Sequence, residues 1–182
     1  MNTQLQAPAF EVAGSLPRGV TVLEASAGTG KTYAIAALAA RYVADGTPLE
    51  RVLLVTFTRM ATGELRERVR ERLGSVLRGL DQVLAGVLFV GDRVVELLAE
   101  GPEELVLRRR NRLARALANF DAATIATTHG FCQEVLGGLG IAADLEPNVE
   151  FVEDLSDLLN EVVDDLYVRR FHGGDEPPFS RV

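Results

Sequence analysis

Short apolar runs alternate along the chain with longer segments of helical periodicity. Three of these runs predict strands, at residues 20–25, 51–58 and 121–127. The second run reads RVLLVTFT and is apolar without alternation, which is typical of a strand covered on both faces. Because strands alternate with helical segments, we expect an α/β fold with a parallel sheet.

Helical segments fill the intervals between these runs. We expect a helix at 31–44 that Gly46 stops, and a long helix at 58–80 that Thr58 or Thr62 caps. Two or three helical pieces should follow over 81–118, with Pro102 near the start of one, and a last helix at 130–139. From residue 144 the chain is acidic. Its apolar residues there recur at helical spacing: Leu155, Leu158, Leu159, Val162, Val163 and Leu166. Residues 173–178 indicate a linker or frayed end.

Length and composition fit a folded globular chain. Its 182 residues suffice for one domain and the start of a second, and 47% are apolar. No run reaches the roughly 18 apolar residues of a membrane span, and no secretory signal opens the sequence. The single Cys132 cannot form an internal disulfide, and no Cys/His pair has metal-ligand spacing. We therefore expect a cytoplasmic protein that needs no membrane.

Charge is distributed unevenly along the chain. Residues 59–78 hold six arginines, residues 105–120 hold five, and residues 144–176 hold eleven acids, within a net charge of −7. The arginine clusters are either solvated helix faces or contacts for nucleic acid. All basic residues are arginine except Lys31. Lysine at that one position indicates a need for a compact ammonium on a flexible stem.

That lysine belongs to a candidate phosphate-binding loop between the first predicted strand and helix. The loop is Ala25, Ser26, Ala27, Gly28, Thr29, Gly30, Lys31 and Thr32, which departs from the Walker A pattern by alanine in the first glycine position. Gly28 and Gly30 permit a tight turn that aims backbone N–H groups at phosphate oxygens. Lys31 would neutralise the β- and γ-phosphates of a nucleotide, and the Thr32 hydroxyl would bind Mg²⁺.

Three segments in order carry a family resemblance. EASAGTGKT (24–32), VTFTRMATGELRERVR (55–70) and TTHGFCQEVL (127–136) resemble motifs I, Ia and Ic of superfamily 1 UvrD-like DNA helicases, of the RecB type (exodeoxyribonuclease V β) in particular. The resemblance implies a P-loop, RecA-like motor domain, partial and of the 1A type, over residues 1–140. It implies the start of a helical 1B-like insertion and a frayed tail over 141–182. ATP and Mg²⁺ would be the cofactors, and DNA with RecC- and RecD-type subunits the partners.

The second and third motifs imply a DNA-binding surface. The family grips a DNA strand with these segments, and the matching residues are Thr56, Phe57, Thr58, Thr128, His129 and Phe131. The alternative is that Phe57 and Phe131 are core aromatics and His129 is a hydrogen-bonded loop residue. We expect Arg66 and Arg70, with Glu67 and Glu71 beside them, to lie on a solvated face with i,i+4 pairs.

The sequence also departs from the family pattern. Arg18 stands where a glutamine usually reads adenine, which leaves base selectivity open, with Gln4 and Gln6 too far away to substitute. Arg59, Met60 and Glu134 are further departures. A motif II carboxylate pair is not found, because residues 151–154 and 162–165 fit a helix better than a strand.

Three functions therefore stay open at this point. The chain is part of an ATP-dependent DNA helicase/exonuclease subunit that unwinds DNA ends in repair and recombination. Alternatively, it is a stand-alone P-loop module that binds nucleotide for regulation, or a phosphotransferase acting on a small molecule. On the first interpretation the fragment alone binds ATP without translocating, and the parent protein is the enzyme.

Overall fold

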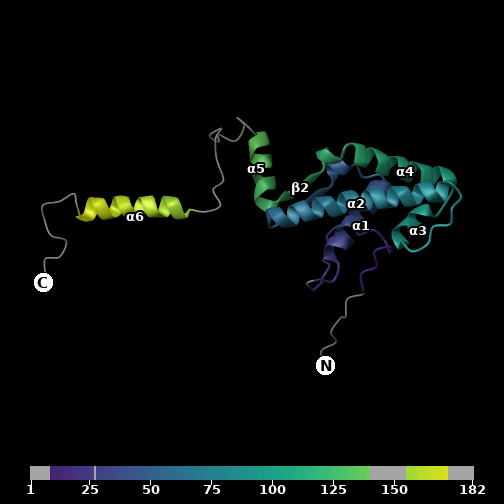
Figure 1. Cartoon of the computed structure of the whole chain (residues 1–182), viewed down its shortest axis with the longest axis horizontal. Coiled ribbons are helices and arrows are strands. Elements are labelled where there is room, and N and C mark those ends of the chain that lie inside the picture. The colour runs from purple at the N-terminus through teal and green to yellow at the C-terminus, as the bar shows by residue number, and fades with distance from the viewer. Residues whose placement is uncertain (1–8, 27, 140–154, 172–182) are drawn as a thin grey trace, which may run out of the picture. The chain divides into compact units, whose positions relative to one another are not determined.

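The computed structural model describes residues 9–26, 28–139 and 155–171 (Figure 1). The chain divides into two compact units, residues 1–132 and residues 133–182. The expected domain boundary at residue 140 stays a prediction. None of the helices in the described part is both long and apolar enough to cross a membrane. These same residues contain no group of three or more His, Cys, Asp or Glu side chains that could hold a metal ion.

Helices dominate the first unit. They are α1 (Lys31–Asp45), α2 (Arg59–Leu84), α3 (Arg93–Ala99) and α4 (Glu103–Ala118), with short 3-10 turns at η1 (Leu49–Arg51) and η2 (Phe120–Ala122). The long helix α2 packs against α1, α3 and α4 (Figure 1). The side chains most completely buried between these helices are Val69, Leu73, Val76, Leu80, Val94, Val95 and Leu113. This helical core supports the elements that carry the motifs.

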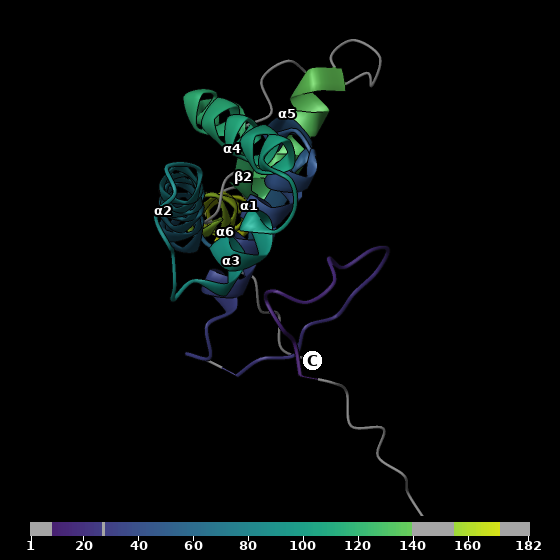
Figure 2. The ribbon, with the colours of Figure 1, turned by 90° about the vertical axis from the view of Figure 1, so that its right-hand side faces the viewer.

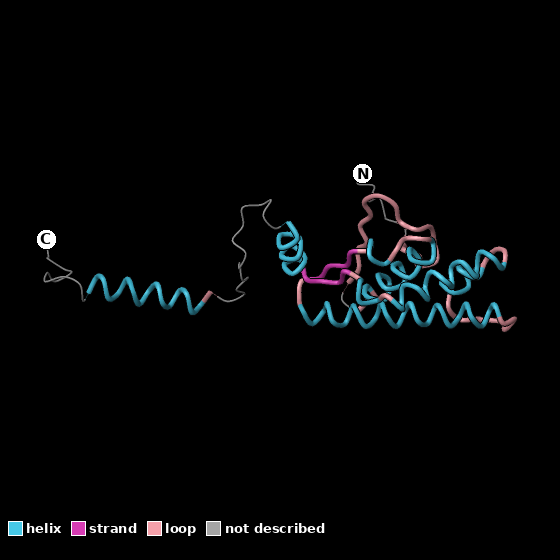
Figure 3. The backbone as a smooth tube through the Cα atoms, turned by 90° about the horizontal axis from the view of Figure 1, so that it is seen from above, coloured by secondary structure: helices cyan, strands magenta, loops and turns pink. Residues whose placement is uncertain are grey.

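The described sheet has two parallel strands, β1 (Leu53–Thr56) and β2 (Thr124–Thr127), drawn in magenta in Figure 3. Leu53 pairs with Thr124 and Thr56 pairs with Thr127. The parallel sheet is as predicted, but both strands are shorter. The expectation that residues 51–58 are covered on both faces is wrong, because Leu53 is 44% and Val55 is 49% exposed. Only the Leu54 face packs on the core.

The strand predicted at residues 20–25 does not form within the described residues. This segment belongs to no sheet, and Val20 and Val22 are 99% and 86% exposed. An apolar run becomes a strand only when a neighbouring strand pairs with its backbone groups. Neither β1 nor β2 supplies that pairing. Apolar composition alone therefore predicted a strand at residues 20–25 that does not form among the described residues.

Helix ends follow the local signals in the sequence. Gly46 ends α1 with φ 121°, and its N–H donates to the carbonyls of Tyr42 and Val43. Thr58 caps α2 by accepting from the Ala61 N–H at 3.1 Å. The alternative cap, Thr62, instead donates its hydroxyl to the Thr58 carbonyl inside the first turn. Pro102 immediately precedes α4, as expected.

The arginines of α4 hold helices together. Arg109 donates to the carbonyls of Leu98 and Glu100, both at 2.8 Å, at the end of α3. Arg112 donates to the carbonyl of Ala44 at 2.9 Å, in the last turn of α1. Carbonyls in the last turn of a helix have no partner within the helix, so a guanidinium satisfies them well. The interpretation of the cluster as a solvated face is therefore wrong for the half-buried Arg109, whereas Arg112 is exposed although it makes this hydrogen bond.

The two arginines of α2 that were expected on a solvated face, paired with glutamates, instead make contacts outside their own helix, although Arg70 is exposed as expected. Arg66 donates to the Ile125 carbonyl at 3.3 Å, and Arg70 lies over the ring of Phe120 with 5.3 Å to its centroid. Both contacts join residues about fifty or more positions apart. They exist because α2 packs against β2, and Phe120 lies just before that strand.

The described helices of the second unit are the later part of α5 and the whole of α6. Helix α5 (Thr128–Leu139) starts in the first unit, two residues before the predicted start, and α6 spans Ser156–Phe171. The predicted acidic helix is confirmed by α6, and residues 162–165 are accordingly helical. Its large apolar side chains are about half exposed, from Phe171 at 43% to Leu166 at 62%. Residues 151–154 and the predicted tail at 173–178 lie outside the described residues.

Candidate nucleotide-binding and strand-end sites

Two glycines of the loop before α1 have the backbone conformation expected of the candidate phosphate-binding loop. Gly28 has φ 75° and Gly30 has φ 88°, in the left-handed region that favours glycine. A Cβ at either position would meet nothing within 4 Å. Backbone angle, and not space, therefore requires glycine here. Gly30 also precedes the first turn of α1, whose free N–H groups and positive dipole favour an anion.

Lys31 lies across this loop. Its Nζ donates to the Ala25 carbonyl at 3.0 Å and to the Ser26 carbonyl at 2.6 Å, while the side chain remains exposed. Thr29 closes the turn by donating its hydroxyl to the same Ser26 carbonyl at 2.7 Å. An ammonium held by neutral carbonyls keeps its full charge for an incoming anion. The next residue, Thr32, is half-buried at the start of α1.

A pocket of about 460 Å³ opens beside the loop, within the usual size range for a small-molecule site. It is lined by Phe10, Leu23, Glu24, Ala25, Ser26, Thr29, Gly30, Lys31, Ala34 and Ile35. The loop supplies the polar side of this pocket. Phe10, Leu23 and Ile35 supply an apolar side. The site therefore fits a ligand that carries both phosphate and an apolar or aromatic group.

Two side chains of α1 anchor the N-terminal segment that contributes Phe10. Arg41, only 5% exposed, donates to the carbonyls of Val12 at 2.7 Å and Gly14 at 2.6 Å. The neighbouring Tyr42 hydroxyl donates to the Pro17 carbonyl. Burial lowers the pKa of Arg41 from its usual value. Figure 2 shows this segment as a long loop that turns back toward the start of α1.

The sequence did not predict this anchoring, although an arginine among the alanines of α1 was a signal for it. Arg18, where the family has glutamine, is exposed. Gln4 and Gln6 lie outside the described residues.

The second candidate site is formed where the two strands end. Thr56 pairs with Thr127, so the segments 56–58 and 128–131 leave the same edge of the sheet. The Thr128 hydroxyl donates to the Thr56 carbonyl at 3.4 Å and joins the two segments. The Thr56 hydroxyl lies 2.6 Å from that of Thr62. The threonines therefore stabilise the strand ends themselves.

The aromatic residues at these strand ends differ in exposure. Phe57 is 93% exposed, so the alternative that it is a core aromatic is wrong. Phe131 is half-buried, and His129 is exposed. The Phe57 side chain is thus open to solvent beside the threonine hydroxyls at this edge of the sheet. Such a ring suits stacking on a base without reading sequence.

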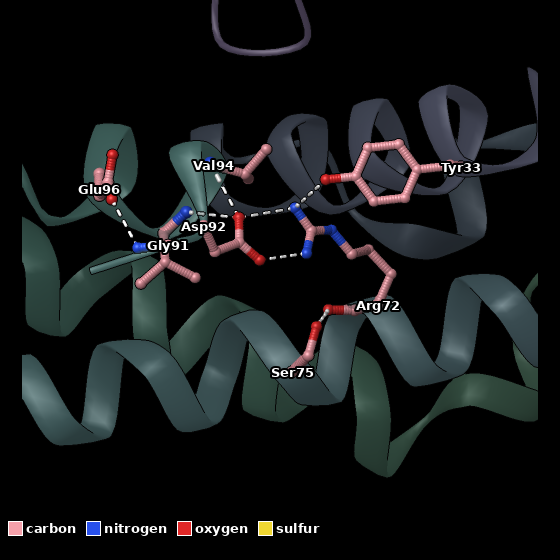
Figure 4. Close-up of polar contacts among 8 residues, drawn as sticks. Tyr33, Arg72, Ser75, Gly91, Asp92, Val94 and Glu96 are labelled. Atoms are coloured by element: carbon pink, nitrogen blue, oxygen red, sulfur yellow. Dashed lines mark hydrogen bonds and ion pairs between the residues drawn. The ribbon is translucent and has the colours of Figure 1, made fainter. Parts of the chain in front are cut away.

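A buried ion pair ties the first turn of α1 to α2 and α3 (Figure 4). Arg72 of α2 holds both carboxylate oxygens of Asp92, and its guanidinium lies 5.2 Å from the ring centroid of Tyr33, the residue after Thr32. Asp92 also caps α3 by accepting from the N–H groups of Val94 and Val95. Burial alone would raise the pKa of Asp92, but the hydrogen bond and charge of Arg72 and the two amides outweigh it and lower that pKa.

The sequence that forms these sites also matches a known protein family. A family model described as "UvrD/REP helicase N-terminal domain" matches residues 4–172, and the chain belongs to this family. The fold is accordingly P-loop, RecA-like α/β, as predicted, with mostly helical content around a parallel two-stranded sheet.

Relatives with assigned names are similar over most of this chain. RecBCD enzyme subunit RecB of Mycolicibacterium smegmatis is 48% identical over 93% of the chain and 15% of that protein. RecB of Haemophilus influenzae is 33% identical over 84% of the chain and 13% of that protein. An ATP-dependent helicase/nuclease subunit of Streptococcus pneumoniae is 26% identical over 88% of the chain and 12% of that protein. The chain thus spans about one seventh of the length of these RecB relatives.

Proposed function

We propose that this chain is the ATP-binding part of an ATP-dependent DNA helicase/exonuclease subunit that unwinds DNA ends in double-strand-break repair and recombination. The observation that carries the proposal is the loop before α1, where Gly28 and Gly30 adopt positive φ and Lys31 lies across the mouth. Membership of the UvrD/REP family and the names of the relatives support it. The helicase activity belongs to the parent protein.

ATP is the proposed ligand of the loop, with Mg²⁺ as its metal. The backbone N–H groups from Gly28 to Thr32 would hold the phosphates, and Lys31 would exchange its carbonyl partners for phosphate oxygens. Thr32 would offer its hydroxyl to Mg²⁺, which screens the charge of the phosphates when bound. The remaining loop residues, Ala25, Ser26 and Ala27, would shape the cradle.

A DNA strand is the proposed ligand of the strand-end site. Thr56, Thr58 and Thr128 would bind sugar and phosphate, and the exposed ring of Phe57 would stack on a base. His129 and Phe131 belong to the same site through the family motif. Partners of RecC and RecD type are proposed for the parent protein because relatives are named as subunits of a RecBCD enzyme. We expect it to act in the cytoplasm.

Replacing the single lysine tests this proposal. Lys31→Ala, introduced into the polypeptide that the native gene encodes, is expected to abolish DNA-stimulated ATP hydrolysis, because the loop loses its only side-chain cation. Arg93→Ala removes an exposed cation on α3 and serves as the matched control, with turnover expected to stay normal. Normal turnover by Lys31→Ala would refute the proposal. ATP binding without any turnover in the wild-type polypeptide would favour a regulatory nucleotide-binding module instead.

A further inference from the structure

The pocket beside the phosphate loop has an apolar side that the phosphates of a nucleotide do not use. Phe10, Leu23 and Ile35 line it together with Ala34, and their exposed fractions are 38%, 40% and 38% for the three large side chains. They come from three separate places in the sequence: the N-terminal segment, the residues just before the loop, and the first turns of α1. Three large apolar side chains left partly open around one pocket indicate a ligand surface of the same character.

The Phe10 ring is held at this pocket by the fold. Its segment makes a turn in which the Gly14 N–H donates to the Glu11 carbonyl at 3.0 Å. Arg41 fastens both sides of that turn to α1 through the carbonyls of Val12 and Gly14. Val12 also packs against the hydrophobic core. A buried arginine that holds a surface segment in this way restricts the motion of Phe10, which lies two residues before Val12.

We propose that Phe10 is the platform on which the base of the bound nucleotide stacks, with Leu23 and Ile35 completing an apolar slot for it. The inference rests on the proposed function, because it requires a nucleoside triphosphate whose phosphates occupy the loop. Lys31 and Phe10 line the same pocket, so one ligand can reach both with its two ends. A planar base is the part of a nucleotide that matches an open ring and aliphatic walls.

On this proposal the base of the nucleotide contacts Phe10, and residue 18 is not needed to bind it. Arg18 is exposed and is not among the residues lining this pocket. Stacking on a ring accepts any base, since every base has a π-face. We therefore expect binding of ATP and GTP to depend on Phe10 to a similar degree. Arg41 acts as a positioning residue for Phe10 and does not contact the nucleotide.

The test compares two ligands that share phosphates and differ in the base. Titration calorimetry with Mg²⁺ measures the affinity of the 182-residue chain for ATP and for inorganic tripolyphosphate. Phe10→Ala is expected to weaken ATP binding about ten-fold or more, the usual loss when a stacking ring is removed. Tripolyphosphate binding should stay within about two-fold of wild type, because stacking contributes nothing to it. Lys31→Ala should weaken both ligands. Phe171→Ala, which removes a ring that is 43% exposed on α6, is the matched control and should change neither.

A ring-preserving variant adds a direct signal, because the chain contains no tryptophan. Phe10→Trp should keep ATP affinity near wild type, and its emission should change on addition of ATP but not of tripolyphosphate. Equal loss of both ligands in Phe10→Ala would overturn the inference, since the ring would then only support the loop. Unchanged ATP affinity in Phe10→Ala, or a silent tryptophan, would also overturn it. In those cases, if Lys31→Ala still weakens binding of ATP and of tripolyphosphate, the proposed function remains supported. If the wild-type chain does not bind ATP at all, the proposed function and this inference are both refuted.

Discussion

The ion pair between Arg72 and Asp92 is expected to contribute a large share of the stability of the first unit. Its side chains are only 9% and 19% exposed, and the guanidinium holds both carboxylate oxygens. Asp92→Ala would leave the Arg72 charge buried without a partner, which costs about 3–5 kcal/mol. The same change removes the cap of α3, for which the typical cost is about 1 kcal/mol. Since whole domains are stable by about 5–15 kcal/mol, the variant should be close to unfolding.

Urea unfolding followed by far-UV circular dichroism measures this loss. Asp81→Ala is the matched control, because Asp81 pairs with Arg110 where the side chains are 45% and 34% exposed. A pair this open should contribute less than about 1 kcal/mol. Adding Arg72→Met to Asp92→Ala should restore part of the lost stability, since no buried charge is then left unpaired. If Asp92→Ala costs no more than Asp81→Ala, or if the double variant is the weaker one, the reasoning is wrong.

The stabilisation from Asp92 should also depend on pH with a definite sign. Its pKa in the folded chain lies below the usual value, so its contribution is present above the unfolded pKa of about 3.9. The contribution is lost as pH falls through the folded pKa. Wild type and Asp92→Asn should therefore differ in unfolding free energy near neutral pH and converge as the solution is acidified below the unfolded pKa and through the lower folded pKa. A difference that grows on acidification would contradict the sign.

Two further changes on α2 test its packing and its cap. Gly79→Ala should destabilise by about 1–3 kcal/mol, because the added Cβ would lie 2.7 Å from a methyl carbon of the buried Val95. Gly63→Ala, where nothing lies within 4 Å, should instead stabilise by about 0.5–1 kcal/mol, and thermal unfolding of both variants compares them directly. Thr58→Ala should cost about 1 kcal/mol by removing the hydroxyl that accepts from Ala61, while Thr58→Ser should be nearly neutral in urea unfolding.

Features set by neighbouring residues were predictable from the sequence. The end of α1 at Gly46 and the cap at Thr58 depend on one residue and the turn beside it. The phosphate loop is equally local, since its glycines set its backbone and Lys31 reaches carbonyls five and six residues away. For such features the sequence window that carries the signal contains the whole interaction.

Features that need a distant partner were missed or overstated. Residues 20–25 have the composition of a strand, but they are unpaired in the described part of the chain. Arg66 was expected to pair within its own helix, yet it reaches a carbonyl 59 residues away. The candidate site shows the same division, because the turn at Gly28 and Gly30 was predicted and the contacts of Arg41 with residues 27 and 29 positions away were not. Periodicity does not encode such contacts.

The internal use of arginine has a consequence for how this chain responds to ionic strength. Five arginines of the two clusters donate hydrogen bonds to carbonyls and carboxylates of the same unit: Arg66, Arg72, Arg109, Arg110 and Arg112. A guanidinium so engaged must give up these hydrogen bonds, which join separate elements of the unit, before it can bind a phosphate. For single-stranded DNA each phosphate contact adds about 0.7 to the slope of log affinity against log salt. The eleven arginines of the two clusters would predict a steep slope. With these five engaged inside the unit, we expect a shallower slope than eleven free arginines would give, and a larger share of DNA binding from stacking and hydroxyl contacts at the strand-end site.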